Sequence, residues 1–300
     1  MTTGAEARRP GAAIPVLAVV GVGLIGGSFA AALRQAGHVD RVLGVGRSRA
    51  TLERARELGL IDEPATLEQA AREADFVLLS APVGALESAL AGLRPFLRPQ
   101  AVVTDAGSTK EDVVRAARRA LGAQAVQFVP GHPIAGSEAA GPQAASAGLY
   151  RGRTVILTPL PENRPADVSR VEAAWQACGA RIRTMDPGSH DAALGAVSHL
   201  PHWLAALYML YVAEGPDASR RLELAGSGFR DFTRIAAGSP EMWRDIFLSN
   251  RTAMLHEIQA LKTVLQDAER ALSGGDGPAL LDLLERAARA RRAWNGEGSE

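Results

Sequence analysis

The sequence predicts an α/β protein whose first part is built on a parallel sheet and whose second part is entirely helical. Two observations lead to this fold class. Between about residues 14 and 187, short apolar runs alternate with longer amphipathic stretches, which is typical of parallel strands with helices on both faces. From residue 188 to 294 only helical patterns remain. We therefore expect two domains, 14–187 and 188–294, with flexible ends at 1–13 and 295–300.

Each element of the first domain follows from its local pattern. The apolar runs predict strands at 16–20, 41–45, 75–81, 101–104, 127–130, 154–158 and 180–184. The stretches between them predict helices at 28–36, 48–58, 66–73, 86–94, 110–121 and 166–178. In the second domain, glycine and proline predict helix ends at 215–216, 226–228, 238–240 and 274–277, because neither residue favours a helix interior.

Composition excludes several classes of protein. Of 300 residues, 47% are hydrophobic and 22% are charged, a balance typical of globular proteins. The 33 basic and 33 acidic residues give zero net charge, so no field favours a nucleic acid or a membrane. The single cysteine, Cys178, forms no internal disulfide and fits a reducing, cytoplasmic compartment. An uncharged stretch between Arg9 and Arg34 has the length of a membrane span, but its glycine spacing favours another explanation.

That spacing is a dinucleotide-binding fingerprint. Gly21, Gly23 and Gly26 form G-x-G-x-x-G directly after the first predicted strand and at the start of a helix. In this context the first glycine makes a tight turn, the second lets the backbone approach a pyrophosphate, and the third allows close helix–strand packing. With Leu24 and Ile25 at the helix N-terminus, these residues predict a Rossmann-type cofactor site. The alternative is a glycine-rich turn without a ligand.

The residues after the second strand bear on the choice of cofactor. An acidic side chain there binds the ribose 2′-hydroxyl of NAD, but this sequence has Arg47, Ser48 and Arg49. Two guanidinium groups and a hydroxyl suit the 2′-phosphate of NADP. We therefore favour NADP, while NAD remains open if both arginines are ordinary solvated charges.

Two polar residues follow later strands. Ser108 lies after the strand at 101–104 and His132 after the strand at 127–130, so both belong to the sheet edge where α/β proteins bind ligands. Imidazole suits proton transfer near neutral pH, and a hydroxyl can orient such a base. Ser108 has an alternative role as a helix N-cap, and a lone loop histidine is often structural. Lys110 is expected to be solvent-exposed or near the cofactor.

The helical part begins with a group of histidines. His190, His199 and His202 fall within 13 residues, which suggests either a metal site or, preferably, a polar substrate wall. Pro201 predicts a local irregularity because it cannot donate a backbone hydrogen bond. Further on, Arg230 and Arg234 are four residues apart and share a face if helical. A guanidinium there can bind a carboxylate or form salt bridges.

Taken together and in order, the motifs GVGLIGGS, DAGSTK, GHPIAGSE, VSHLPH, GFRDFTRIA and MWRDIF resemble the prephenate/arogenate dehydrogenase family of tyrosine biosynthesis. The resemblance covers roughly residues 16–294. It implies that His132 is the catalytic base, that Ser108 orients it, and that Arg234 binds a substrate carboxylate. His190, His202 and Trp243 match positions near the substrate. It further implies a homodimer formed through the helical domain, a small-molecule substrate and no metal.

The implied reaction is the oxidative decarboxylation of prephenate to 4-hydroxyphenylpyruvate, with hydride transfer to NAD(P)+. Arogenate, or both substrates, remain open, because the two differ only in a keto or amino group. A β-hydroxyacid dehydrogenase or imine reductase fits less well. Enzymes of that group typically depend on a lysine in their helical domain, and Lys262, the only lysine there, belongs to an amphipathic helix expected at 257–269. A non-catalytic NADP-binding sensor is a more remote alternative. If His132 acts as a base, activity should rise with pH through its pKa.

Overall fold

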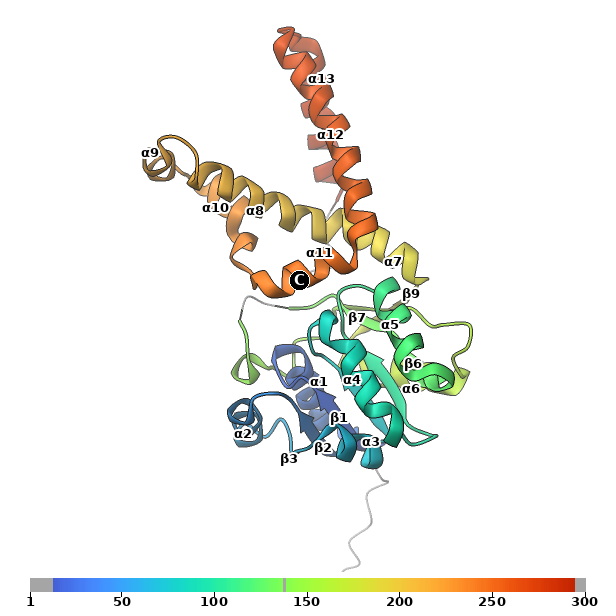
Figure 1. Ribbon diagram of the computed structural model, residues 1–300. Helices are drawn as coiled ribbons and strands as arrows, with labels where there is room; N and C mark the ends of the chain where they lie inside the picture. Colours follow the sequence, from blue (N-terminus) through green and yellow to red (C-terminus); the bar gives the residue numbers. More distant parts are fainter. Residues whose placement is uncertain (1–12, 137–138, 295–300) are drawn as a thin grey trace, which may run out of the picture. The chain divides into compact units, whose positions relative to one another are not determined.

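The computed structural model describes residues 13–136 and 139–294 of the chain (Figure 1). The chain divides into two compact units between His190 and Asp191, three residues beyond the domain boundary expected from the sequence. The predicted tails, apart from Ala13, and Ser137 and Glu138 of the GHPIAGSE motif lie outside the described residues.

The first unit contains a six-stranded parallel sheet. Its strands are β1 (Ile14–Val20), β2 (Val39–Val45), β3 (Glu63–Pro64), β4 (Phe76–Leu79), β5 (Val102–Asp105) and β6 (Phe128–Val129). They are arranged in the order β3-β2-β1-β4-β5-β6. Strands β2 and β3 lie on one side of β1, and strands β4, β5 and β6 lie on the other. The connections that leave β1 and β4 therefore turn away from each other at the edge between these two strands. Ligands of open α/β sheets bind at such a point. The two-residue β3 is too short to have left an apolar pattern in the sequence.

A second, three-stranded sheet completes the unit. It consists of β7 (Gly131–Pro133), β8 (Thr154–Leu157) and β9 (Arg181–Thr184). β7 is antiparallel to β8, and β8 is parallel to β9. The last two predicted strands are therefore real but do not extend the parallel sheet. β7 replaces a predicted loop, because three residues that include a glycine and a proline show no strand alternation.

Helices cover both faces of the parallel sheet, as the sequence predicted. α1 (Leu24–Gln35), α2 (Arg49–Glu57) and α6 (Pro165–Ala177) share one apolar cluster with Leu17 and Val19 of β1. α3 (Leu67–Glu73), α4 (Leu86–Leu93) and α5 (Glu111–Leu121) share the other with Ala18 and Val20. Successive residues of β1 thus point to opposite faces, the two-residue period of a strand buried on both sides.

The second unit is helical throughout its described residues. α7 (Pro187–Leu194) leads into it, and a π-helical turn (Gly195–His199) follows. Next come α8 (Leu200–Ala213), α9 (Ala218–Glu223), α10 (Ser227–Thr233), a 3-10 turn (Arg234–Ala237), α11 (Pro240–Ser249), α12 (Arg251–Ser273) and α13 (Gly277–Ala293). Four of the helix ends fall at the glycine and proline positions predicted from the sequence. A fifth break, at Asn250, was not predicted.

Pro201 explains the π-helical turn. A proline inside a helix lacks an N–H group and its ring clashes with the preceding turn. In this chain the wider turn of Gly195–His199 ends just before Pro201, which occupies the first turn of α8. π-turns of this kind are frequent at functional sites. The predicted irregularity is therefore present, and it falls at the group of histidines.

None of the described helices is both long and apolar enough to cross a membrane. The described part of the uncharged stretch before Arg34, residues 13–33, instead forms β1, the glycine loop and most of α1.

Candidate active site

The glycine loop joins β1 to α1 in the geometry that its spacing predicts. Gly21 has φ +100°, a conformation that favours glycine, and a Cβ there would lie 2.8 Å from the Ala81 backbone nitrogen. A Cβ on Gly26 would lie 2.6 Å from Val19 Cγ1 and 2.5 Å from the Gly21 carbonyl oxygen. Gly23 differs, because a Cβ there meets no atom within 4 Å. Only Gly23 therefore lies beside open space.

The N-terminus of α1 suits an anion. Gly23 is the N-cap, no side chain caps the helix, and its first turn, which includes Leu24 and Ile25, contains no acidic residue. The backbone N–H groups and the positive end of the helix dipole are thus available to a phosphate. These residues fit the pyrophosphate of a dinucleotide. Ser80, which sequence reasoning missed, supports the loop, since its hydroxyl donates to the Gly21 carbonyl at 2.8 Å.

The loop after β2 is exposed. Ser48 is the N-cap of α2, and its hydroxyl accepts a hydrogen bond from the Thr51 amide at 3.2 Å. Arg49 Nε lies 4.0 Å from Glu53 Oε1, with the arginine side chain 92% exposed. Arg47, two residues after the end of β2, is exposed. Two of the three residues assigned to a 2′-phosphate therefore also make contacts within α2.

The strongest polar cluster lies at the carboxyl end of β5. Asp105 and Lys110 form an ion pair in which both side chains are completely buried. Lys110 Nζ also donates to the Gly131 carbonyl oxygen at 2.8 Å. The Asp105 carboxylate accepts the amides of Gly107 at 2.8 Å and Gly131 at 3.0 Å. The expectation that Lys110 is exposed or near the cofactor was wrong about exposure. The sequence feature that could have indicated this burial is an acidic residue, Asp105, five residues before the lysine.

His132 follows this cluster in β7. Its side chain is largely buried, and its Nδ1 lies 2.9 Å from Nε2 of His190, whose own side chain is fully buried. The two rings meet edge to face with centroids 5.1 Å apart. Only one hydrogen atom occupies such a contact, so the tautomer of one ring fixes that of the other. His190 had been matched to the substrate pocket, and the structure places it against His132.

Ser108 lies between two residues of the buried cluster. It is half-buried and directly follows Gly107, whose amide the Asp105 carboxylate binds. Its alternative role as an N-cap is excluded, because the N-cap of α5 is Lys110. Ser108 and His132 thus lie on segments that the same carboxylate holds.

In the second unit, His202 and Trp243 lie together. Their rings stack with centroids 3.6 Å apart and an interplanar angle of 14°. Gly238 makes this close approach feasible, since a Cβ there would lie 2.8 Å from Trp243 Nε1 and 3.1 Å from His202 Cε1. Burial lowers the pKa of His202 to about 4. This imidazole is therefore neutral near pH 7 and adds no positive charge to a pocket.

Asn250 contacts a second buried histidine of this unit, His199. Its side-chain amide donates to the Asp191 carbonyl at 2.8 Å and contacts His199 Nδ1 at 3.0 Å. With the amide nitrogen as donor, Nδ1 of His199 is the acceptor. This buried asparagine lies between α11 and α12, which accounts for the unpredicted break.

Arg230 and Arg234 do not share one α-helix. α10 ends at Thr233, and Arg234 begins a 3-10 turn. Both arginines are exposed. Among the described residues, no group of three or more histidine, cysteine, aspartate or glutamate side chains is arranged to hold a metal ion.

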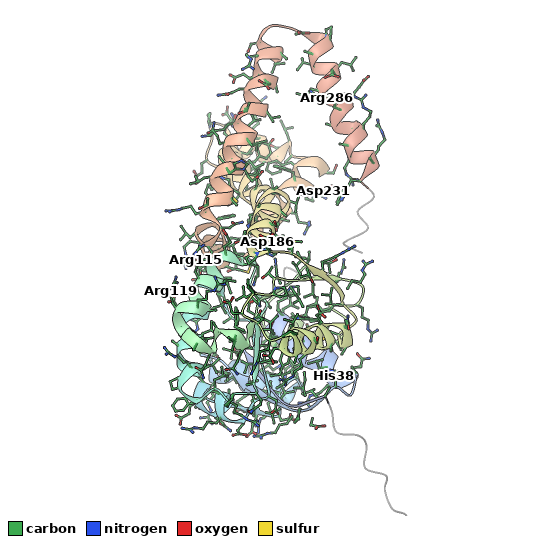
Figure 2. All side chains as sticks on the ribbon, turned by 90° about the vertical axis from the view of Figure 1, so that its right-hand side faces the viewer. His38, Arg115, Arg119, Asp186, Asp231 and Arg286 are labelled. Carbon is green, nitrogen blue, oxygen red and sulfur yellow. The ribbon has the colours of Figure 1, made fainter. Side chains whose placement is uncertain are left out.

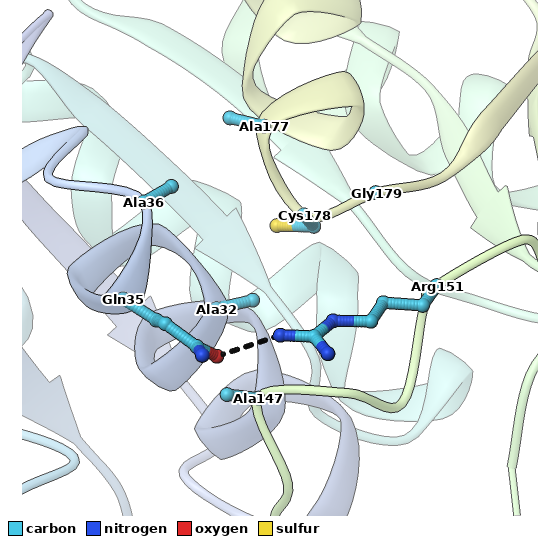
Figure 3. A pocket seen from close by; sticks show the side chains of 8 residues that line it. All are labelled: Ala32, Gln35, Ala36, Ala147, Arg151, Ala177, Cys178 and Gly179. Atoms are coloured by element: carbon cyan, nitrogen blue, oxygen red, sulfur yellow. Dashed lines mark hydrogen bonds between the residues drawn. The ribbon is translucent and has the colours of Figure 1, made fainter.

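A small pocket of about 240 Å³ lies elsewhere in the first unit (Figure 3). It is next to Gln35 and Ala36, at the opposite end of α1 from the glycine loop, and Arg151 donates to Gln35 Oε1 across it at 3.2 Å. Cys178 lines it, and burial raises the pKa of that thiol well above its usual range. The pocket contains none of the predicted site residues.

Comparison with known families matches both units. Residues 29–184 match the prephenate dehydrogenase nucleotide-binding domain, and residues 186–286 match the prephenate dehydrogenase dimerization domain. The glycine loop lies just before the first matched range.

Three relatives are similar over nearly their whole length. The chain is 34% identical to a cyclohexadienyl dehydrogenase of Zymomonas mobilis, over 92% of this chain and 95% of the relative. Among solved structures, Aquifex aeolicus prephenate dehydrogenase with hydroxyphenyl propionate and NAD+ is 34% identical, with a TM-score of 0.87 and coverage of 93% and 98%. Synechocystis arogenate dehydrogenase is 31% identical, with a TM-score of 0.79 and coverage of 93% and 99%. The chain therefore belongs to the prephenate dehydrogenase family.

Proposed function

We propose that this protein is an NAD(P)-dependent dehydrogenase that converts prephenate to 4-hydroxyphenylpyruvate by oxidative decarboxylation. The observation that supports this most strongly is the buried imidazole of His132, paired with His190 in the same unit as a glycine loop open to a dinucleotide. The family relationship supports the same reaction class, since relatives at 31–34% identity are named dehydrogenases of prephenate, arogenate or cyclohexadienyl substrates.

His132 acts as the general base in this reaction. A bound nicotinamide cofactor, held by the glycine loop, would supply the acceptor for the hydride of the substrate carbon that bears the ring hydroxyl. His132 takes the proton of that hydroxyl as the hydride leaves. The carboxylate of the same ring departs as carbon dioxide and leaves its electron pair in the ring, and His132 returns the proton to the ring oxygen, which gives the phenol of 4-hydroxyphenylpyruvate. Because aromatisation provides the driving force, the chain has to supply mainly alignment and a base.

The contact with His190 determines which nitrogen of His132 is basic. If Nδ1 of His132 holds the shared hydrogen and donates it to His190 Nε2, then Nε2 of His132 carries the lone pair that accepts the proton. The opposite tautomer would place a hydrogen on Nε2 and leave no base. We therefore assign His190 a positioning role toward His132, in place of a direct contact with substrate.

The substrate-binding side chains come from the second unit. Arg234 is exposed and binds a substrate carboxylate through its guanidinium. His202, held flat against Trp243, contributes a neutral ring that can donate or accept a hydrogen bond. Ser108, beside the buried cluster of the first unit, orients His132 and approaches the substrate hydroxyl.

Prephenate is proposed ahead of arogenate on the descriptions of the two matched family domains. Relatives of similar identity are named for either substrate or for both. A dual specificity is the second candidate on that ground.

NADP is proposed as the preferred cofactor, because Arg47 follows β2 where an acidic residue would bind NAD. The relative solved with NAD+ makes this preference worth testing directly. Arg47→Ala should lower kcat/KM for NADP+ by about 10-fold, the value of one charge-assisted contact, and leave that for NAD+ unchanged. Equal changes with both cofactors would exclude a 2′-phosphate contact at Arg47.

The chain is proposed to act as a homodimer through its helical unit. Several leucines of this unit are exposed in the single chain, with 60% of Leu255, 58% of Leu265, 70% of Leu272, 59% of Leu281 and 62% of Leu284 accessible. Apolar side chains spaced along two long helices favour association with a second copy.

The decisive experiment follows cofactor reduction at 340 nm with prephenate and with arogenate, each combined with NAD+ and with NADP+. Reduction with prephenate supports the proposed reaction, and the four rates measure both specificities. A folded protein that binds the cofactor but reduces it with neither substrate would refute the enzyme and favour a dinucleotide-binding sensor.

A further inference from the structure

The buried ion pair between Asp105 and Lys110 has no part in the reaction described above. Both side chains are fully buried, and the burial of two charges is costly unless every group is paired. Replacing such pairs by apolar residues is often neutral or stabilising. Stability alone is therefore a weak reason for this pair, and its position in the fold suggests another.

The contacts of the pair converge on Gly131. The carboxylate of Asp105 accepts the Gly131 amide, and the ammonium of Lys110 donates to the Gly131 carbonyl. The Gly131 amide belongs to the peptide that enters this residue, and its carbonyl to the peptide that continues into His132. Both peptide groups that flank the Gly131 Cα are thus held by the same ion pair. Since a glycine backbone is otherwise the freest in the chain, this double contact removes rotation directly before the imidazole.

The same carboxylate also holds the segment of Ser108. Asp105 Oδ2 accepts the amide of Gly107 at 2.8 Å, the residue before Ser108. Lys110, two residues after Ser108, closes the segment from the other side. Together with the pairing of β7 to β8, one ion pair therefore holds the backbone that presents both polar side chains of the proposed site.

A lysine at position 110 suits the directions of the two contacts that its side chain makes. The chain has 33 basic residues, of which only Lys110 and Lys262 are lysines. Its other described ion pairs with acidic side chains use arginine or histidine. A planar guanidinium directs its donors in one plane, whereas a compact ammonium directs three donors in different directions. The site joins a carboxylate to a carbonyl of another segment, which suits an ammonium.

We propose that Asp105 and Lys110 are positioning residues, which fix the peptide planes around Gly131 and thereby aim the imidazole of His132 at the substrate hydroxyl. The expected effect of the ion pair on the reaction rate rests on the proposed dehydrogenase function. Its expected effect on the order of the backbone around Gly131 rests on the hydrogen bonds alone.

The test uses the full chain and two substitutions. Lys110→Met leaves the Asp105 carboxylate without its cation. The double variant Asp105→Val/Lys110→Met replaces the pair by apolar side chains of similar size, which avoids an unpaired buried charge but removes the contacts to Gly107 and Gly131. We expect kcat to fall at least 30-fold in both, while the KM for cofactor changes less than threefold, because the glycine loop is untouched. Exchange of the Gly107 and Gly131 amides with deuterium should accelerate at least tenfold in both.

Two controls separate positioning from general destabilisation. Arg119 lies with Arg115 on the outside of α5 (Figure 2) and forms an exposed ion pair with Glu87. Arg119→Met therefore removes a basic side chain from an ion pair, as Lys110→Met does, but should leave kcat unchanged. Val171→Ala removes a buried contact of α6 and lowers the melting temperature without touching Gly131. Its kcat below the melting transition should remain that of the unchanged protein.

Three results would overturn the proposal. The first is a kcat within threefold of the unchanged protein in the double variant. The second is unaltered exchange of the Gly131 amide. The third is a loss of kcat that Val171→Ala reproduces at the same melting temperature. If Lys110→Met does not fold, the double variant decides the question. If the unchanged protein reduces no cofactor, the proposed function fails, and amide exchange still decides whether the pair orders Gly131.

Discussion

Gly23 and Gly26 allow a matched test of the cofactor site, because the same substitution should act on ligand binding at one position and on stability at the other. A Cβ on Gly23 meets no atom within 4 Å, and its φ of −109° lies outside the left-handed region that favours glycine. A Cβ on Gly26 would lie 2.5 Å from a backbone oxygen and 2.3 Å from Ser80 Oγ. The two glycines belong to one loop, so each variant is the control for the other.

The magnitudes follow from these contacts. In Gly23→Ala, the lower entropy of the unfolded chain stabilises by about 0.4–1 kcal/mol, and the poorer N-cap costs about 1 kcal/mol. The free energy of unfolding should therefore change by less than about 1 kcal/mol. The added methyl group occupies the space of the approaching pyrophosphate, and losing a hydrogen bond to a charged group costs about 1.5–3 kcal/mol. We expect a 10- to 150-fold weaker affinity. Gly26→Ala should lower stability by about 1–3 kcal/mol through overpacking.

The assay combines urea unfolding with titration of each variant by NAD+ and NADP+. The expected result is a Gly23→Ala protein with wild-type stability and impaired cofactor binding, and a Gly26→Ala protein with lowered stability. If Gly23→Ala binds both cofactors as tightly as the unchanged protein, the pyrophosphate does not pass over Gly23 and the reasoning fails.

Three further predictions concern other parts of the chain. His132→Asn should lower kcat by about 10²–10⁴-fold and abolish the rise of rate with pH; a variant rate that still rises with pH would contradict the assignment of the base. Because the pKa of His202 is lowered to about 4, only the unfolded chain binds this proton between about pH 6.5 and 4, so acidification over that range should destabilise the protein by roughly 2 kcal/mol. Urea unfolding of His202→Gln should lack this contribution, and an identical pH dependence would refute it. Leu265→Glu, which places a charge on an exposed apolar position of α12, should raise the dissociation constant of the proposed dimer at least 100-fold. Light scattering that finds an unchanged dimer would exclude this face of α12.

The sequence predicted those features that depend on local patterns. The glycines at 21 and 26 specified the loop between β1 and α1, since Gly21 imposes a backbone condition and Gly26 a packing condition within a few residues, while Gly23 lies beside open space. The helix ends of the second unit coincided with glycine and proline for the same reason. The Rossmann-type sheet followed from alternating apolar runs.

Features that depend on distant contacts were not predictable. The burial of Lys110 requires Gly131, 21 residues away, and the partner of His132 lies 58 residues away. Asn250 interrupts two helices because its amide binds groups near residue 191 and at His199. β7 forms only by pairing with β8, and its three residues have no strand pattern of their own.

The cluster around Gly131 also constrains the order in which the chain acquires its structure during synthesis. Asp105 and Lys110 leave the ribosome close together, but the peptide groups that complete their coordination follow about 20 residues later. Until β7 arrives, both charges are better solvated by water than by a half-built sheet edge. The carboxyl end of β5 is therefore expected to close late, after β1 and β4 have paired across 59 residues. A nascent chain that stops short of Gly131 would have a nearly complete parallel sheet and an open, hydrated edge where the reaction is proposed to occur.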